Sequence, residues 1–139
     1  MKIQLLLPSE QGKIIDGYKI IKDIKMLDME PDNSIEELIM YGYPNSFTKD
    51  TFEQSFNFIC SKIRMGGCIR FVICLAETLL VNKNSAALND SINTLNEIIG
   101  NINFVPKALD FYSILNKNNM KIDYIKKVGG FLLDCSVKR

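Results

Sequence analysis

Runs of apolar residues separated by polar turns predict four strands in the first part of the chain, over residues 2–7, 18–24, 36–42 and 68–76. Pro8 stops the first run, and the breaker Pro-Asp-Asn-Ser at 31–34 precedes the third. The third run fits strand or helix by periodicity. Its short length and the following Gly42 and Pro44 favour a strand. Residues 68–76 are almost continuously apolar and β-branched, as expected of a central buried strand.

A helix is predicted between the third and fourth of these strands, because apolar side chains recur there at spacings of three and four. They are Phe52, Phe56, Ile59, Cys60 and Ile63. Asp50 and Glu53 have the spacing of a capping box at the start of this helix. Gly66-Gly67 is expected to end the helix and launch the strand. Because these glycines precede a strand and do not open a helix, they do not form a phosphate-binding loop.

The second part of the chain predicts two further helices and a closing hairpin. Apolar spacing indicates helices over residues 88–99 and 108–115, the latter ended by Asn118-Asn119. Two strand-like runs then flank Gly129-Gly130, which is a strong signal for a type I′ hairpin turn. Alternating strands and helices predict a mostly parallel sheet with helices on its faces and right-handed crossovers. A chain of 139 residues suits one domain, residues 1–139.

Composition and charge narrow the classes of function. Hydrophobic residues make up 47% and charged residues 24% of the chain, and the formal net charge is +1. This balance offers no bulk attraction to nucleic acid or to an anionic membrane. The apolar start of the chain is too short for a signal peptide, and no segment is long enough to span a bilayer. We therefore expect a protein of the cytoplasm.

The cysteines and the absence of histidine limit the available chemistry. Cys60, Cys68, Cys74 and Cys135 show no CxxC spacing and lie in apolar surroundings, so buried reduced thiols are expected rather than a metal site. With no histidine in the chain, the commonest general base is unavailable. Glu36, Glu37 and Tyr43 remain as acid–base groups, but no motif assigns any of them a catalytic role.

Several segments, in the right order, resemble the class I S-adenosylmethionine-dependent methyltransferases, especially their short members. IDGYKIIKDI (15–24) resembles the family's Gly-aromatic pair leading into a second strand that ends in an acidic residue. MLDMEPDNSIEELIMYG (26–42) resembles the third-strand acidic position, a Pro-Asp-x-Ser turn and the fourth strand. Residues 52–73 resemble the helix, Gly-Gly and fifth strand, and residues 109–138 the last helix and closing hairpin. The resemblance implies an α/β, three-layer Rossmann-like methyltransferase fold with a mostly parallel sheet and a C-terminal antiparallel hairpin.

The resemblance also implies positions for the cofactor S-adenosylmethionine. Its amino-acid moiety would lie against the loop after the first strand, its ribose against the acidic end of the second, and its adenine near the next acidic position. On this chain the corresponding residues are Leu7, Ser9, Gly12, Asp23, Asp28 and Tyr41. From the residues alone, Asp23 could equally be a solvated carboxylate at a strand end, and Asp28 could cap a turn. Tyr41, Tyr43 and Asn45 are expected at the mouth of a pocket.

The first loop departs from the family pattern and leads to two hypotheses. Active members have a glycine-rich turn there, whereas this chain has Pro8, Ser9 and Glu10, and the family's Leu-Glu-His after the fourth strand is replaced by Tyr-Gly-Tyr. The first hypothesis is a methyltransferase-like pseudoenzyme that has lost or weakened cofactor binding and serves as a binding subunit for a protein partner or a second copy. The alternative is an active methyltransferase with an unknown acceptor. A flavodoxin-like regulator is a third class, which the closing hairpin disfavours.

Overall fold

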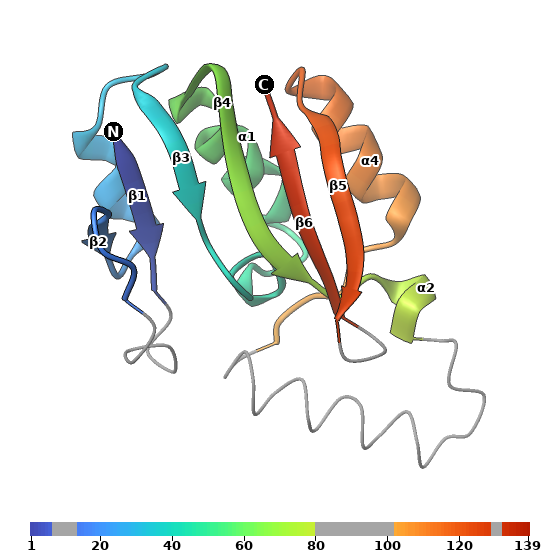
Figure 1. Cartoon of the computed structure of the whole chain (residues 1–139). Helices are drawn as coiled ribbons and strands as arrows, with labels where there is room; N and C mark the ends of the chain where they lie inside the picture. The colour runs from blue at the N-terminus through green and yellow to red at the C-terminus, as the bar shows by residue number, and fades with distance from the viewer. Residues whose placement is uncertain (7–13, 80–101, 129–131) are drawn as a thin grey trace.

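A computed structural model describes residues 1–6, 14–79, 102–128 and 132–139, which contain a six-stranded sheet (Figure 1). The strands are β1 (Lys2–Leu5), β2 (Lys19–Ile21), β3 (Ile35–Ile39), β4 (Ile63–Ile73), β5 (Lys121–Val128) and β6 (Leu132–Lys138). Their order in space is β2-β1-β3-β4-β6-β5. The first four strands are parallel, and β6 is antiparallel to both β4 and β5. The predicted α/β fold class, with a C-terminal antiparallel hairpin, is confirmed.

Two long helices cover one face of this sheet. Helices α1 (Phe52–Lys62) and α4 (Ala108–Lys117) lie behind the sheet in Figure 1. The aromatic rings of Phe56, Phe71 and Phe111 meet between them and β4, at centroid separations of 5.8 to 5.9 Å with edge-to-face geometry. All three side chains are completely buried, so this aromatic cluster is the centre of the core.

Short elements complete the helical side and one end of the sheet. The 3-10 helix η2 (Ile24–Met29) follows β2 and buries Leu27 in the main core. A second 3-10 turn, η3 (Pro44–Ser46), follows β3, and the four-residue helix α2 (Ala76–Leu79) follows β4. No helix among the described residues is long and apolar enough to cross a membrane.

The sheet face opposite α1 and α4 carries polar side chains, and we call it the open face. Strand register places Gln4, Ile39, Arg70, Ser136 and Tyr124 in one row across it. The long helices of the described residues all lie on the other face, so those residues do not supply the second helical layer expected from the resemblance. Thirteen residues, 6–18, join β1 to β2, and residues 7–13 of this connection lie outside the described residues.

The predicted capping box and glycine stop of α1 differ from the structure. Thr51, not Asp50, occupies the N-cap position, and its hydroxyl lies 2.7 Å from that of Thr48 instead of capping the helix. The helix ends at Lys62, and β4 begins with the next residue. Gly66, at φ +78°, therefore lies within β4, where the pairing with β3 shifts register between residues 35 and 37. The glycines are structural, as expected, but they shape a bulge and do not end a helix.

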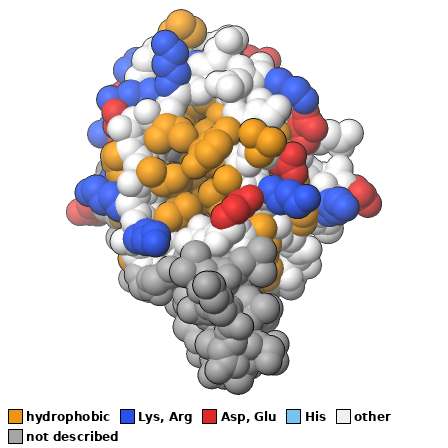
Figure 2. All heavy atoms as spheres, turned by 90° about the vertical axis from the view of Figure 1, so that its right-hand side faces the viewer, with side chains coloured by type: hydrophobic (Ala, Val, Ile, Leu, Met, Phe, Trp, Pro, Cys, Tyr) orange, Lys and Arg blue, Asp and Glu red, His pale blue; other side chains and the backbone are white. Residues whose placement is uncertain are grey.

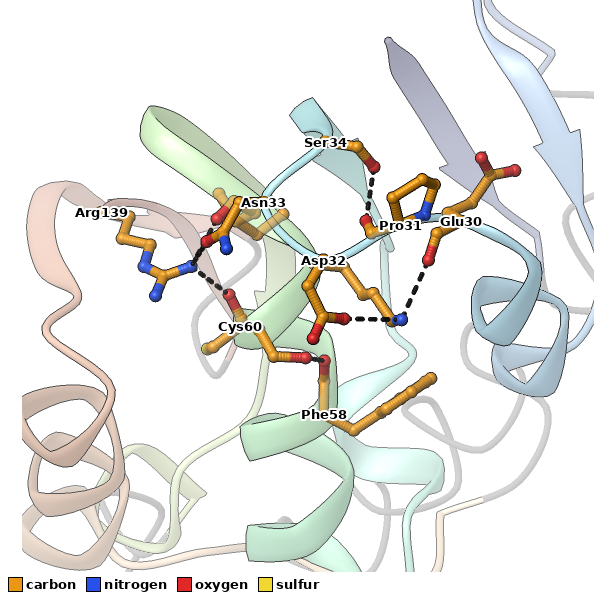
Figure 3. Close-up of polar contacts among 11 residues, drawn as sticks. Glu30, Pro31, Asp32, Asn33, Ser34, Phe58, Cys60 and Arg139 are labelled. Atoms are coloured by element: carbon orange, nitrogen blue, oxygen red, sulfur yellow. Dashed lines mark hydrogen bonds and ion pairs between the residues drawn. The ribbon is translucent and has the colours of Figure 1, made fainter.

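A polar network explains why α1 can end without the glycines (Figure 3). The ammonium of the buried Lys62 lies 2.9 Å from the backbone oxygen of Glu30 and 2.8 Å from the Asp32 carboxylate. The C-terminal residue Arg139 donates from Nη1 to the backbone oxygen of Ile63 at 2.6 Å and to that of Cys60 at 3.3 Å. The N–H groups of Asn33 and Ser34 donate to the backbone oxygens of Ser61 and Lys62, so the carbonyl groups at the end of α1 have partners from other segments.

The remaining predicted elements are largely confirmed. The run at 36–42 forms a strand and not a helix, as favoured, but the strand β3 begins at Ile35 and ends at Ile39. Helix α4 and the two hairpin strands occur where the sequence placed them. The predicted helix over residues 88–99 and the glycine turn at 129–130 lie outside the described residues.

Candidate functional site

The strand order creates one topological switch point, at the carboxyl ends of β1 and β3. The chain leaves β1 toward β2 on one side, and β3 then lies on the other side of β1. In open α/β sheets, ligands bind outside the carboxyl ends of strands at such a point. The described residues nearest to it are Leu6 and the loop 40–47 that follows β3. This edge of the sheet is therefore the candidate site.

Tyr43 links the loop after β3 to the segment that follows β2. Its ring packs on Phe47 at a centroid separation of 5.5 Å and contacts the main core. Its hydroxyl is hydrogen-bonded to the backbone of Ile24, just beyond the end of β2. Burial raises the pKa of the Tyr43 hydroxyl, and the nearby Asp23 carboxylate adds to that increase. Tyr43 is thus a protonated, anchored side chain whose ring belongs to the packing of the loop.

Asp23 and Asp28 lie on the exposed surface beside Tyr43 and η2. One oxygen of Asp23 accepts a hydrogen bond of 2.9 Å from the backbone N–H of Lys25 and so caps η2. The resemblance matched Asp28 to an acidic position at the family's third strand. In this structure Asp28 lies within the 3-10 helix η2, and the described sheet has no strand at that place. It lines a surface groove of about 290 Å³ against Ser55 and Phe58 of α1. Asp28 consequently faces the helical side of the molecule.

Tyr41 lies on the opposite face of the sheet from Asp28. Its hydroxyl is half-buried near the charges of Arg70 and Asp134, both on the open face. Burial raises its pKa, while the Arg70 guanidinium acts in the opposite direction. The structure therefore brings Asp23 close to Tyr43 but does not bring Asp28 and Tyr41 into one hollow. Leu7, Ser9 and Gly12 lie outside the described residues, and their assignment to cofactor binding stays a prediction.

Asn45, expected at a pocket mouth, is instead a completely buried clamp. Its Nδ2 donates to the backbone oxygens of Cys74 and Phe104, each at 3.0 Å, and its Oδ1 accepts from the Cys74 N–H at 2.8 Å. Its own backbone oxygen accepts from Asn103 and Phe104. A side chain with these partners holds the loop after β3, the end of β4 and the segment before α4 together. It has no atom left to offer a ligand.

The open face carries a polar network that the sequence reasoning missed. The Glu37 carboxylate lies 3.8 Å from the Lys2 ammonium and 3.7 Å from the Arg70 guanidinium. Burial and a hydrogen bond to Glu37 raise the pKa of Tyr18 to about 12. Arg70 is also hydrogen-bonded to Tyr124, which raises the pKa of the guanidinium. The sequence feature that could have indicated this network is a pair of opposite charges in two neighbouring predicted strands, Glu37 and Arg70, each at a position that alternates with apolar residues.

This network favours structural support over catalysis. The Tyr18 hydroxyl is protonated at neutral pH, and the Glu37 carboxylate is paired with two cations. Arg70 Nε and Asp134 Oδ1 are the buried side-chain polar atoms without a hydrogen-bond partner among the described residues. The described residues also contain no cluster of three or more side chains suited to a metal ion.

The clearest hollows among the described residues lie away from the switch point. Besides the groove at Asp28, one of about 260 Å³ lies between α1 and α4 at Phe52 and Ile114, and one of about 250 Å³ lies between α4 and β5 at Tyr112 and Ile122. Each falls below the roughly 300 to 1,000 Å³ of most small-molecule sites. None of these three hollows lies at the carboxyl ends of β1 and β3, the edge where this type of sheet binds ligands.

Known structures with a similar fold include several methyltransferases. An O-methyltransferase family protein from Burkholderia thailandensis aligns with 88% of this chain at a TM-score of 0.59 and 7% identity. An O-methyltransferase family 2 protein from Planctomyces limnophilus, solved with apigenin, aligns with 94% at a TM-score of 0.61 and 11% identity. A SAM-dependent methyltransferase from Archaeoglobus fulgidus aligns with 88% at a TM-score of 0.61 and 11% identity.

These similarities establish the fold. The chain has a class I S-adenosylmethionine-dependent methyltransferase-like fold, as the resemblance of its segments implied. It spans only 36% of the Burkholderia protein and 38% of the Planctomyces protein, but 68% of the Archaeoglobus protein. The sequence matches no protein-family model and no curated protein.

Proposed function

We propose that this chain is a methyltransferase-like pseudoenzyme, in which the cofactor edge of the fold has been converted into internal packing and the domain serves as a binding subunit. The observation that carries this proposal is Tyr43, which reaches from the loop after β3 to the backbone of Ile24 beyond β2. An adenosine at the ends of these strands would have to displace that ring from Phe47 and break its hydrogen bond.

The neighbouring groups support the same proposal. One oxygen of Asp23, the residue matched to the ribose-binding position, is already engaged in capping η2. The first loop has Pro8, Ser9 and Glu10 in place of a glycine-rich turn, and Glu10 would add a negative charge near the carboxylate of the cofactor. These residues do not fit S-adenosylmethionine, so we assign the chain no methyl-transfer step. The four cysteines are free thiols, three of them buried and Cys68 only half-buried, and reduced thiols suit a cytoplasmic location.

Isothermal titration with S-adenosylmethionine and S-adenosylhomocysteine tests the proposal. We expect no saturable heat up to about 1 mM ligand, a concentration at which a site worth about 4 kcal/mol would be half filled. The variant Asp23→Ala should behave as the wild type does. Asp16→Ala is the matched control, since Asp16 is also an exposed aspartate next to β2.

Saturable micromolar binding that is lost in Asp23→Ala but kept in Asp16→Ala would refute the proposal. That result would favour the alternative, an active methyltransferase with a divergent loop. The Tyr43→Ala variant adds a second measurement. If cofactor binding appears only after this ring is removed, the closed edge is the cause of the lost function.

A further inference from the structure

Strand β5 is an edge strand, and its two sides differ in chemistry. It runs for eight residues, pairs with β6, and has no other strand neighbour among the described residues. A free edge of this length exposes backbone N–H and C=O groups that another extended chain can pair with. The question is which kind of chain its side chains would accept.

The side of β5 that faces α4 is largely apolar, with Lys127, opposite Leu133, as its one charged residue. Exposed hydrophobic residues gather there in a continuous patch (Figure 2). Ile122 and Ile125 of β5 are 42% and 39% exposed, and Leu109 and Tyr112 of α4 are 78% and 37% exposed. Leu109 and Tyr112 are three positions apart, so they project from one face of the helix. Between α4 and β5 lies the hollow of about 250 Å³, which is lined by Tyr112, Leu115, Asn116, Met120, Lys121 and Ile122.

The other side of β5, continuous with the open face, is cationic. Lys121 lies opposite Lys138, and Lys126 lies opposite Asp134, which places both lysines on that side. The Lys126 ammonium lies 4.9 Å from the centre of the Tyr124 ring, and neither Lys121 nor Lys126 forms an ion pair with a described residue. Residues 102–128 contain five lysines and two aspartates, a net charge of +3 compared with +1 for the whole chain.

We propose that β5 binds an extended segment of a partner protein as an added strand, and that this segment alternates apolar and acidic side chains. Successive side chains of a strand point to opposite faces. One set would enter the hollow beside Tyr112 and Ile122, and the other would meet Lys121 and Lys126. Main-chain pairing at the edge would supply affinity, and the two sets would supply specificity.

A second copy of this chain fits the edge less well than an acidic partner. A two-fold dimer brings the same surface of both copies together. Here it would place the lysine-rich side of one β5 against that of the other, and like charges opposite each other destabilise paired strands. This inference rests on the proposed function, because it specifies the chemistry of the partner that the proposed binding subunit would bind. Its structural support is separate, because β5 lies three places from β3 in the sheet.

The test uses the full chain and three labelled peptides of about ten residues, enough to span β5. The first alternates valine and glutamate, the second has the same composition with the valines and glutamates in two blocks, and the third alternates valine and lysine. Binding is measured by fluorescence anisotropy. We expect the first peptide to bind at least about tenfold more tightly than either other peptide and to weaken with added salt.

Variants identify the surface that binds. Lys121→Glu combined with Lys126→Glu should abolish the preference for the glutamate peptide or transfer it to the lysine peptide. Lys25→Glu combined with Lys49→Glu makes the same change of charge at exposed lysines elsewhere and should leave the preference intact. Ile122→Thr keeps a β-branched side chain but removes apolar contact, and it should weaken binding by about tenfold.

Each outcome decides the inference. Equal binding of all three peptides, or no binding at about 1 mM, overturns it and leaves the lysines as protection of an edge strand against pairing. Concentration-dependent dimerisation that is lost in Ile122→Thr also overturns it, in favour of a second copy. S-adenosylhomocysteine is titrated into the same samples to separate the two proposals. Binding of neither ligand overturns this inference alone, whereas binding of both the cofactor and the first peptide overturns the proposed function alone.

Discussion

Replacing Asn45 by alanine should be one of the most destabilising single changes in this protein. The side chain is completely buried and makes three hydrogen bonds to backbone groups: the N–H and the oxygen of Cys74, and the oxygen of Phe104. The alanine variant leaves all three backbone groups buried without this partner. An unsatisfied buried group costs about 1 to 3 kcal/mol, so we expect a loss of about 3 to 6 kcal/mol. That is a large part of the roughly 5 to 15 kcal/mol typical of a folded domain.

Asn45→Asp separates the contributions of the acceptor and the donor. The carboxyl group keeps an acceptor for the Cys74 N–H but loses the amide donors to two carbonyl oxygens. Burial beside those oxygens should raise the pKa of the new aspartate in the folded state above its unfolded value of about 3.9. The stabilising contribution of the neutral carboxyl group is then fully present below the unfolded pKa of about 3.9. It is lost as the pH rises through the higher pKa of the folded state. This variant should therefore be closer to the wild type at about pH 4 than at pH 7.

Urea unfolding followed by far-ultraviolet circular dichroism measures these differences, since the chain has no tryptophan to serve as a probe. Asn103→Ala is the control, because Asn103 is exposed and its side chain donates only to the backbone oxygen of Ser46. It should cost less than about 1 kcal/mol. Amide hydrogen exchange adds a local measurement, in which the Cys74 N–H should exchange faster in Asn45→Ala. A loss below about 1 kcal/mol in Asn45→Ala, or no pH dependence in Asn45→Asp, would refute the clamp.

Two further predictions concern the bulge in β4 and the buried thiols. A Cβ at Gly67 would lie 2.9 Å from the backbone oxygen of Ile35. We therefore expect Gly67→Ala to lower the free energy of unfolding, measured by urea titration, by about 1 to 3 kcal/mol. Unchanged stability would mean that β3 and β4 separate easily at this point. Burial raises the pKa of Cys60 and Cys135 to about 12 and that of Cys74 to about 11, from an ordinary 9.0. Their contribution to stability is fully present below pH 9 and is lost as the pH rises toward those values. Stability should fall above pH 9, and a thiol reagent at pH 8 should label these cysteines only after unfolding; rapid labelling of the native protein would contradict their burial.

Much of the fold was predictable because it depends on local pattern. The continuous apolar run in β4 and the stripe from Phe52 to Ile63 distinguish strand from helix through side-chain periodicity alone. The order of the elements, together with the resemblance of several segments, was enough to indicate the methyltransferase-like fold. Boundaries were less predictable. Gly66 was expected to end α1, but Arg139, which is 73 positions further along the chain (139 − 66), contributes to satisfying the end of that helix.

The candidate site depended mainly on contacts between distant residues. Sequence pattern placed Asp23 at the end of β2 and Tyr43 and Asn45 after β3, but it could not tell a ligand-facing side chain from a packed one. Asn45 is committed to Cys74 and Phe104, which are 29 and 59 residues away, and Tyr43 to the backbone beyond β2. Similarly, the open face appears only when strand register brings Glu37 and Arg70 together. Periodicity reports which way a side chain points along its own element, whereas its partners are set by how the elements pack. For this reason the fold could be predicted from the sequence, whereas the partners of Tyr43 and Asn45 were decided by the tertiary structure.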